Sequence, residues 1–204
     1  MKVVAFVPIR LNSQRVEGKN LRLLGGEPLL CHILRTLLEV EAIDEVYVYC
    51  SDPAVRPYLP DGVRFLRRSP RLDAFTAEVV ADVYLLAHAT SPFIRPATIA
   101  AALHKVTDEG YDSAFSAERM QTFAWYRGEP LHYALDAIPR TQEIEPVFVE
   151  TSAFFIFRRE IWCDLHQRIG RHPYVAVVDR IEGIDIDYPE DFALAEVIAK
   201  LPNR

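Results

Sequence analysis

Residues 3–22 of the chain read Val3-Val4-Ala5-Phe6-Val7-Pro8-Ile9-Arg10-Leu11-Asn12-Ser13-Gln14-Arg15-Val16-Glu17-Gly18-Lys19-Asn20-Leu21-Arg22. The first five are apolar, which predicts a buried first strand. Helical spacing of apolar residues then runs from Pro28 to Leu38, with the proline suited to a first turn. A long polar loop therefore separates the first strand from the first helix.

That loop is cationic, although the whole chain has a formal net charge of -6. It contains Arg10, Arg15, Lys19 and Arg22 against the single acid Glu17. Ligands of open α/β sheets bind beyond the carboxyl ends of the strands, so a cationic loop there is placed to meet an anion, and a phosphate chain fits best. A solvated basic loop is the alternative.

Glycine-rich phosphate loops are excluded by spacing. The sequence contains neither G-x-x-x-x-G-K-[ST] nor G-x-G-x-x-G, so side-chain cations must supply most of the positive charge.

Strand and helix patterns alternate along much of the chain, as expected for an α/β protein. The expected strands are residues 45–50, 63–66, 83–87, 150–157 and 174–178, and the expected helices are residues 75–80, 96–106 and 159–169. The connection between the strands ending at residue 66 and beginning at residue 83 is short for a parallel crossover.

Length and composition restrict the class of protein. A chain of 204 residues predicts one domain, residues 1–204. The acidic balance argues against nucleic acid as a partner.

The apolar runs predict where the protein is found. None of them approaches the roughly 18 residues of a membrane span, and no leader pattern opens the chain, so we expect a cytoplasmic protein that does not bind a membrane. Three cysteines without a C-x-x-C pair agree, and Cys31 and Cys50 are expected to be buried.

Two acids near the C-terminus suggest a metal site. Side chains alternate along an extended segment, so Asp185 and Asp187 in Asp-Ile-Asp lie on the same side. Convergent carboxylates beside a cationic site suit a hard ion such as Mg²⁺. Alternatively, Asp187 caps the helix that begins near Pro189, and Glu190 and Asp191 favour its first turn.

Three separated motifs resemble one enzyme family across almost the whole chain. They are Pro8-x-Arg10-x-x-Ser13-x-Arg15-x-x-x-Lys19-Asn20 with the following Leu24-Gly25-Gly26-x-Pro28-Leu29, then Ala89-Thr90-Ser91-Pro92, and finally Asp185-Ile-Asp187-Tyr-Pro189-Glu190-Asp191-Phe192. The chain resembles the CMP-nonulosonic acid synthetases, that is, the acylneuraminate cytidylyltransferases and their relatives for legionaminic, pseudaminic and ketodeoxyoctulosonic acids. The resemblance implies a three-layer Rossmann-like nucleotidyltransferase fold with a mostly parallel sheet.

The implied reaction joins CTP to a 2-keto-3-deoxy sugar acid, giving a CMP-sugar and pyrophosphate. By the resemblance, the catalytic residues are Arg10, Arg15, Lys19 and Asp187. The same resemblance adds nucleotide contacts from Ser13, Asn20 and Arg67, with Arg68 as the alternative to Arg67. Mg²⁺ is the implied cofactor, held by Asp185 and Asp187.

Acceptor contacts carried over from the family are His88, Thr90, Ser91, Arg140 and Thr151. His88 stands where many relatives have Gln, and we expect it to keep a hydrogen-bond donor there or, alternatively, to be an interior histidine. Thr151 replaces an Asn of Glu-Asn-Gly-Ala. Both departures concern the acceptor, so the identity of the sugar acid is left open.

Residues 113–149 break the alternating pattern, and within them residues 116–149 are expected to form an arm with an aromatic hairpin that turns at Gly128. In the resembled family this region is a dimerisation arm that closes the partner's sugar site, which implies a homodimer.

Two other functions remain open. One is a catalytically silent CTP-binding protein, suggested by the short crossover and the changes at His88 and Thr151. The other is a nucleotidyltransferase acting on a sugar 1-phosphate, although the G-x-G-x-R loop usual there is absent. A hydrolase or zinc enzyme is disfavoured, because the sequence has no G-x-S-x-G elbow and no H-x-x-x-H spacing.

Overall fold

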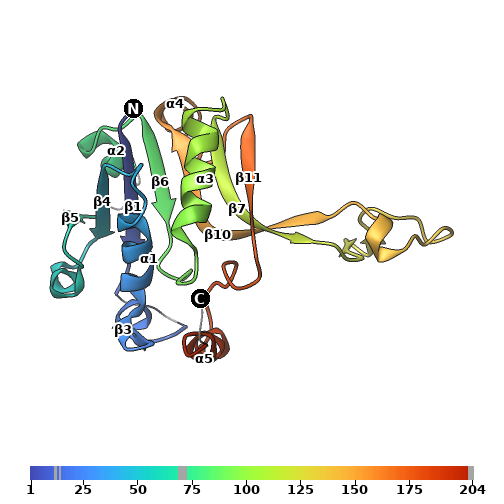
Figure 1. The fold of residues 1–204 in the computed structure, drawn as a ribbon, viewed down its shortest axis with the longest axis horizontal. Helices are drawn as coiled ribbons and strands as arrows, with labels where there is room; N and C mark the ends of the chain where they lie inside the picture. The colour runs from blue at the N-terminus through green and yellow to red at the C-terminus, as the bar shows by residue number, and fades with distance from the viewer. Residues whose placement is uncertain (12, 14, 69–72, 202–204) are drawn as a thin grey trace.

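The centre of the molecule is a mixed seven-stranded sheet with the order β11-β7-β10-β6-β1-β4-β5 (Figure 1). The computed structural model describes residues 1–11, 13, 15–68 and 73–201. Within it, β10 is antiparallel to both of its neighbours and the other neighbouring strands are parallel. The strands are β1 (Val3–Ile9), β4 (Glu45–Cys50), β5 (Val63–Arg67), β6 (Val83–Ala87), β7 (Ser113–Met120), β10 (Val147–Arg158) and β11 (Pro173–Val178).

Helices cover both faces of this sheet, which confirms the predicted three-layer α/β fold. Successive side chains of β1 point to opposite faces, so Val3, Ala5 and Val7 enter one core and Val4 and Phe6 enter another. Helices α1 (Leu29–Leu38) and α3 (Pro96–Thr107) pack on the first face, and α2 (Asp73–Glu78) and α4 (Arg159–Leu165) pack on the second. Cys31 and Cys50 are buried, as predicted. None of the described helices has the length and apolar character needed to cross a bilayer.

The predicted helix over residues 159–169 is too long. His166 adopts a left-handed conformation with φ 52°, and its N–H donates to the Trp162 carbonyl, which ends α4 at Leu165. The strand that we predicted over residues 150–157 is longer in the structure. It is β10, which runs from Val147 to Arg158 and contributes to a projecting arm.

A third apolar cluster joins three distant parts of the chain near the carboxyl edge of the sheet. Helix α5 (Pro189–Ile198) packs there against the short hairpin of β2 (Leu23–Leu24) and β3 (Glu27–Pro28). The buried members include Leu24, Leu29, Phe93, Ile186 and Phe192. This packing brings the first loop, the loop after β6 and the acidic segment together.

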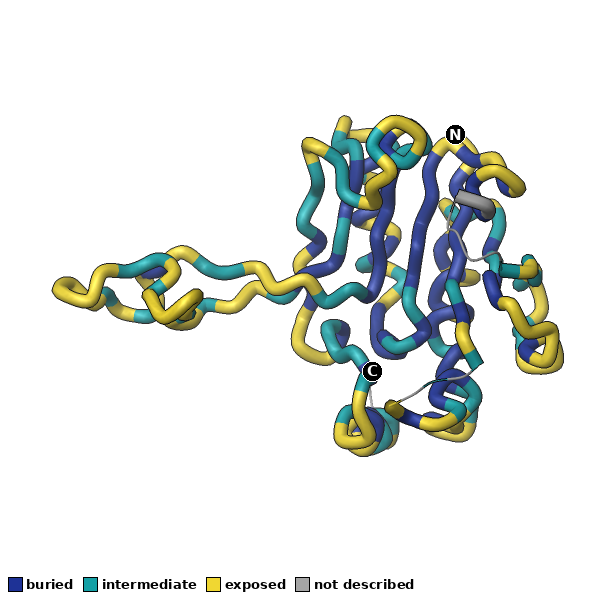
Figure 2. The backbone as a smooth tube through the Cα atoms, turned by 180° about the vertical axis from the view of Figure 1, so that it is seen from behind, coloured by how far each residue is buried: buried dark blue, intermediate teal, exposed yellow. Residues whose placement is uncertain are grey.

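The arm is formed by the far ends of β7 and β10, which continue their pairing as far as Met120 and Val147. Between them lie β8 (Trp125–Tyr126), β9 (Glu129–Pro130) and η3 (Thr141–Glu143). The hairpin turns at Gly128, with φ 84°, as predicted. Figure 1 shows the arm projecting from the body, and Figure 2 shows that its residues are mostly exposed or half-buried.

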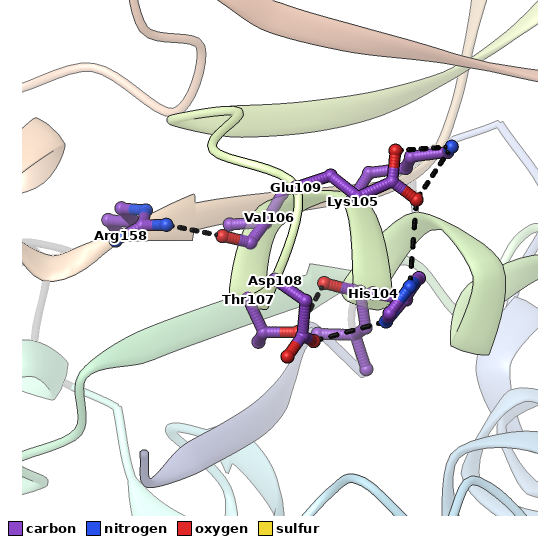
Figure 3. Close-up of polar contacts among 8 residues, drawn as sticks. His104, Lys105, Val106, Thr107, Asp108, Glu109 and Arg158 are labelled. Atoms are coloured by element: carbon purple, nitrogen blue, oxygen red, sulfur yellow. Dashed lines mark hydrogen bonds and ion pairs between the residues drawn. The ribbon is translucent and has the colours of Figure 1, made fainter.

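Polar contacts fix the C-terminal end of α3 to the sheet (Figure 3). Arg158, at the end of β10, donates from Nη2 to the Val106 carbonyl oxygen at 2.6 Å. Lys105, in the last turn of α3, pairs with Glu109 just beyond the helix at 2.7 Å. A cationic donor at the last carbonyls of a helix stabilises its end.

A bulge in β10 carries backbone strain beside the loop after β6. Its pairing with β7 is interrupted between Glu150 and Phe155, and Ser152 within this stretch has φ 57°. A left-handed conformation costs a residue with a Cβ atom about 1–2 kcal/mol. The Ser152 carbonyl contacts His88, so this strained turn contributes to the position of that histidine.

We predict that Ser152→Gly raises the free energy of unfolding by about 0.5–1 kcal/mol, because relief of the left-handed strain exceeds the roughly 0.5–1 kcal/mol entropic cost of glycine. Urea denaturation measures the change. Ser51→Gly, at an exposed serine without a positive φ, is the control and should give no gain. Equal effects of the two substitutions would contradict the strain argument.

The turn after β11 is held by a buried carboxylate. Glu182 accepts hydrogen bonds from the Arg95 backbone N–H at 3.0 Å, from Arg95 Nη2 at 2.6 Å and from Thr98 Oγ1 at 2.6 Å. These donors belong to the N-terminal end of α3, where a negative charge is favourable. Burial by itself raises the pKa of Glu182, but the hydrogen bonds from Arg95 and Thr98 outweigh it and lower the pKa.

We predict that Glu182→Gln lowers the free energy of unfolding by about 1.5–3 kcal/mol near neutral pH, the usual contribution of hydrogen bonds to a charged group. The folded-state pKa of Glu182 lies below the ordinary value of 4.5, so its stabilisation is complete above that value. It is lost as the pH falls through the folded-state pKa.

Denaturation curves of the wild type and the variant should therefore converge in acid. Glu41→Gln, at an exposed glutamate, is the matched control and should stay within about 0.5 kcal/mol of the wild type at each pH. A Glu182 effect that does not change with pH would contradict this prediction.

Candidate functional site

A cavity of about 510 Å³ lies beyond the carboxyl ends of β1 and β6. The chain passes from β1 to β4 and β5 on one side and then returns to β6 on the other side of β1. Such a topological switch point is where open α/β sheets bind ligands. The cavity is lined by Pro8, Arg10, Ser13, Arg15, Val16, Lys19, Asn20, Arg68, His88, Ala89, Thr90 and Asp187.

Lys19 joins the first loop to the acidic segment. It begins the short helix η1 (Lys19–Leu21), and it is buried. Its Nζ donates to the Ile186 carbonyl oxygen at 2.6 Å and lies 3.2 Å from Asp187 Oδ1. Two groups predicted from distant motifs therefore face the same cavity.

Asp187 has a second cationic partner. Arg15 Nη1 lies 2.7 Å from Asp187 Oδ2, and the Arg15 guanidinium lies over the Tyr188 ring. The alternative that Asp187 caps α5 does not match the geometry. The N-cap is Tyr188, and Asp191 Oδ2 accepts from the backbone N–H groups of Asp187 and Tyr188 at 2.9 and 2.7 Å.

Asp185 supplies an unsatisfied oxygen next to Asp187. The intervening Ile186 has its side chain in the third apolar cluster, and its N–H donates to the Thr90 carbonyl oxygen at 2.8 Å. Asp185 Oδ1 is buried and has no hydrogen-bond partner among the described residues. Burial raises the pKa of Asp185, a hydrogen bond from the Thr90 side chain opposes this rise, and the nearby charge of Asp187 adds to it.

These two carboxylates fit a magnesium ion. A hard divalent cation would give Asp185 Oδ1 its missing partner, and Mg²⁺ is commonly held by one or two carboxylates together with substrate phosphates. Among the described residues, no group of three or more His, Cys, Asp or Glu side chains is gathered for a metal. Substrate phosphates and water would therefore have to complete the ligand set.

Arg10 and Arg68 form a second cationic patch in the cavity lining. Burial lowers the pKa of Arg68, and the positive charge of Arg10 lowers it further. Neither guanidinium has a carboxylate within ion-pair distance in the described part of the chain. Two adjacent cations without counter-charges form a site for an anion.

Arg67 was the predicted nucleotide contact, but its neighbour Arg68 lines the cavity. Arg67 is exposed and ends β5, whereas the backbone N–H of Arg68 donates to the Cys50 carbonyl oxygen at 2.9 Å. Both residues were cations at a strand end, and the sequence held no signal that separated them.

Asn20 closes the first loop. It is buried, and its Nδ2 donates to the Arg10 carbonyl oxygen at 2.8 Å. Its side-chain amide therefore links the two ends of the cationic loop and fixes the path of the chain beside Arg10.

His88 is neutral and presents an acceptor. Its Nδ1 lies 2.6 Å from the Ser152 carbonyl oxygen, which can only accept, so Nδ1 carries the proton. Burial lowers the pKa of His88 despite this hydrogen bond, and the Arg168 charge lowers it further. The lone pair of the neutral ring is then on Nε2. This geometry favours a hydrogen-bond acceptor at Nε2 over the expected donor, and the contact of His88 with the sugar stays a prediction.

Three predicted acceptor contacts lie off the cavity lining. Thr151 Oγ1 donates to Ser116 Oγ at 2.8 Å, and Ser91 is buried. Arg140 is exposed on the arm at the start of η3. Of the five predicted acceptor contacts, His88 and Thr90 line the cavity of their own chain.

Comparison with known sequences identifies the family. The model of the family described as Cytidylyltransferase matches residues 4–160. N-acylneuraminate cytidylyltransferase A of Danio rerio is 24% identical over 215 residues, covering 95% of this chain and 50% of that protein. CMP-N,N'-diacetyllegionaminic acid synthase of Legionella pneumophila is 28% identical over 236 residues, covering 98% and 97%. The chain thus spans about half the length of the Danio relative.

Solved structures share the fold. A CMP:2-keto-3-deoxy-manno-octonic acid synthetase complexed with CTP has a TM-score of 0.75 at 20% identity, with 97% of this chain and 98% of that chain covered. 2-C-methyl-D-erythritol 4-phosphate cytidylyltransferase of Thermus thermophilus has a TM-score of 0.68 at 17% identity, with coverage of 98% and 100%. The resemblance drawn from the three motifs is confirmed, and the chain belongs to the cytidylyltransferase family.

Proposed function

We propose that the protein transfers CMP from CTP to a 2-keto-3-deoxy sugar acid of the nonulosonic type and releases pyrophosphate. The observation that carries this proposal is the contact of Lys19 with Asp187, which brings the cationic first loop and the acidic segment together at one cavity. Family membership supports the nucleotide, and the motifs that resemble the nonulosonic acid enzymes support the acceptor.

The cations of the cavity are proposed to bind the triphosphate. Arg10 and Arg68 are free of carboxylates among the described residues, and Lys19 is fixed at the boundary with the acidic segment. These groups, with Ser13 and Arg15, would neutralise the charge that develops on the departing pyrophosphate. Catalysis of this kind depends on positioning and electrostatics.

Asp185 and Asp187 are proposed to hold the divalent ion. When bound, Mg²⁺ would supply charge neutralisation at the phosphate and would lower the pKa of the attacking hydroxyl. The protein's own contribution is orientation: Thr90 binds the backbone of Ile186, and Asp191 binds the backbone of Asp187. The buried Ile186 side chain further restricts the segment.

The acceptor is proposed to bind beside His88 and Thr90. Its anomeric hydroxyl oxygen would form a bond to the α-phosphorus in line, while the bond from that phosphorus to the bridging oxygen of pyrophosphate breaks and the hydroxyl proton passes to water. Neutral His88 would accept a hydrogen bond from the acceptor through Nε2. This preference for a donor on the substrate is a reason to screen several sugar acids.

A homodimer is proposed to complete the acceptor site. The arm exposes many large apolar side chains, which favours burial against another protein surface. They include Phe123, Trp125, Tyr126, Leu131, Leu135, Ile138, Phe148 and Val149. A second copy that covers the arm would bring Arg140 of the partner subunit toward the acceptor carboxylate.

Pyrophosphate release tests the proposed function. The protein is incubated with CTP, Mg²⁺ and separate sialic, legionaminic, pseudaminic and ketodeoxyoctulosonic acids, and CMP-sugars are detected by mass spectrometry. We expect pyrophosphate and a CMP-sugar with at least one acid. Binding of CTP without turnover of any acid would favour a silent CTP-binding protein, and turnover of a sugar 1-phosphate alone would favour that other class of nucleotidyltransferase.

We predict that Arg68→Ala raises the KM for CTP by about 10- to 100-fold, the effect of losing a hydrogen bond between charged groups worth about 1.5–3 kcal/mol. Arg67→Ala removes an equal charge one residue away and should change this KM less than about twofold. Steady-state kinetics measures both. A larger effect at Arg67 than at Arg68 would contradict the assignment.

We also predict that Trp125→Glu together with Ile138→Glu converts dimers to monomers, because each charge would be buried without a partner at the proposed interface. Sedimentation equilibrium measures the mass in solution. Both side chains are exposed in the single chain, so the fold should be retained. Val80→Glu, at an exposed apolar residue of the body, is the control. Dimers that persist in the double variant, or a monomeric wild type, would contradict the proposed arm contact.

A further inference from the structure

Both carboxylate oxygens of Asp187 have cationic partners within the chain. Oδ1 lies 3.2 Å from Lys19 Nζ, and Oδ2 lies 2.7 Å from Arg15 Nη1. The proposed function gives these same groups other partners, namely a divalent ion for Asp187 and phosphate oxygens for the cations. The ion pairs therefore have to be exchanged when nucleotide binds.

The two cations are held with different strength. Lys19 also donates to the Ile186 carbonyl oxygen at 2.6 Å, and its side chain is only 11% exposed. The Arg15 side chain is 55% exposed, and its described contacts are with Asp187 and the Tyr188 ring. An exposed ion pair contributes little to stability, so Arg15 is the partner that can be released at low cost.

Arg10 and Arg68 provide the contrast within the same cavity. They have no carboxylate partner among the described residues, so an arriving phosphate meets them without displacing anything. To reach Arg15, a phosphate must displace Asp187 and also meets repulsion from that carboxylate. Two like charges a few ångströms apart near a protein surface repel each other, and solvent screens this repulsion only in part.

We propose that Asp187 occupies the phosphate-binding position of Arg15 in the free protein and makes nucleotide binding depend on a divalent ion. On binding, Asp187 exchanges Arg15 for the cation, and Arg15 exchanges Asp187 for a phosphate oxygen. Lys19 stays in place through its contact with Ile186. This inference rests on the proposed function and adds a role for Asp187 in controlling the order in which charges are paired.

The exchange has a reciprocal consequence. If Asp187 weakens the binding of metal-free nucleotide, then Arg15 must weaken the binding of a divalent ion in the absence of nucleotide. The reason is that Arg15 and the divalent ion compete for the carboxylate of Asp187. Removal of the Asp187 charge should therefore strengthen the binding of metal-free nucleotide, and removal of the Arg15 charge should strengthen the binding of a divalent ion.

Isothermal titration calorimetry of CTP tests the first half. In EDTA, Asp187→Asn should bind CTP about fivefold or more tightly than the wild type, which corresponds to about 1 kcal/mol for an exposed pair. Added Mg²⁺ should strengthen CTP binding by the wild type and have little effect on the variant. Glu190→Gln removes an exposed acid three residues away and should behave as the wild type.

Electron paramagnetic resonance of Mn²⁺ without nucleotide tests the second half. Arg15→Gln should bind Mn²⁺ several-fold more tightly than the wild type. Arg22→Gln removes the same charge from the same loop, where Arg22 pairs with Glu196, and should leave Mn²⁺ binding unchanged.

The outcomes separate this inference from the proposed function. The proposed exchange of ion pairs would be overturned if Asp187→Asn bound CTP in EDTA no more tightly than the wild type. It would also be overturned if Glu190→Gln had an effect of equal size. The proposed function would stand if the wild type still bound CTP with Mg²⁺. Failure of the wild type to bind CTP in either condition would overturn both.

Discussion

The site depends on the contact of the Lys19 ammonium group with the acidic segment. It is buried, and its charge is compensated by the Ile186 carbonyl and the Asp187 carboxylate, which lie far along the sequence. A buried ammonium without such partners costs several kcal/mol, so the first loop and the acidic segment have to meet. The apolar cluster of Leu24, Phe93, Ile186 and Phe192 stabilises this arrangement, because it packs the region after the first loop against the acidic segment and α5.

From this contact follows a division of the cavity into two electrostatic parts. On one part, Arg10 and Arg68 have no described counter-charge and are available to an anion. On the other, Asp187 is paired with cations, and behind it Asp185, which is not one of the lining residues, has a buried oxygen without a partner in the described part of the chain. A nucleotide triphosphate with a divalent ion is complementary to both parts at once, and this complementarity is the physical basis of the proposed cytidylyl transfer.

Much of this arrangement could be predicted from the sequence. The apolar first strand and its cationic loop predicted a site at the sheet edge, where the structure has a cavity lined by Arg10, Arg15 and Lys19. The alternation in Asp185-Ile-Asp187 predicted convergent acids; Asp187 lines this cavity, and a metal contact of Asp185 stays a prediction. Details that depend on tertiary contacts could not be predicted. The choice of Arg68 over Arg67 depends on the path of the chain after β5, and the acceptor character of His88 depends on the strained Ser152 carbonyl. Thr151 turns toward Ser116, a contact set by the β10 bulge.

The central claim is that the first loop and the acidic segment bind one nucleotide between them. Anomalous diffraction from crystals grown with CTP and Mn²⁺ tests it most directly. The account predicts one Mn²⁺ peak at coordination distance from Asp185 and Asp187, with phosphate density that reaches Lys19 and Arg68. A nucleotide bound in another cavity, or a Mn²⁺ peak away from these carboxylates, would contradict it.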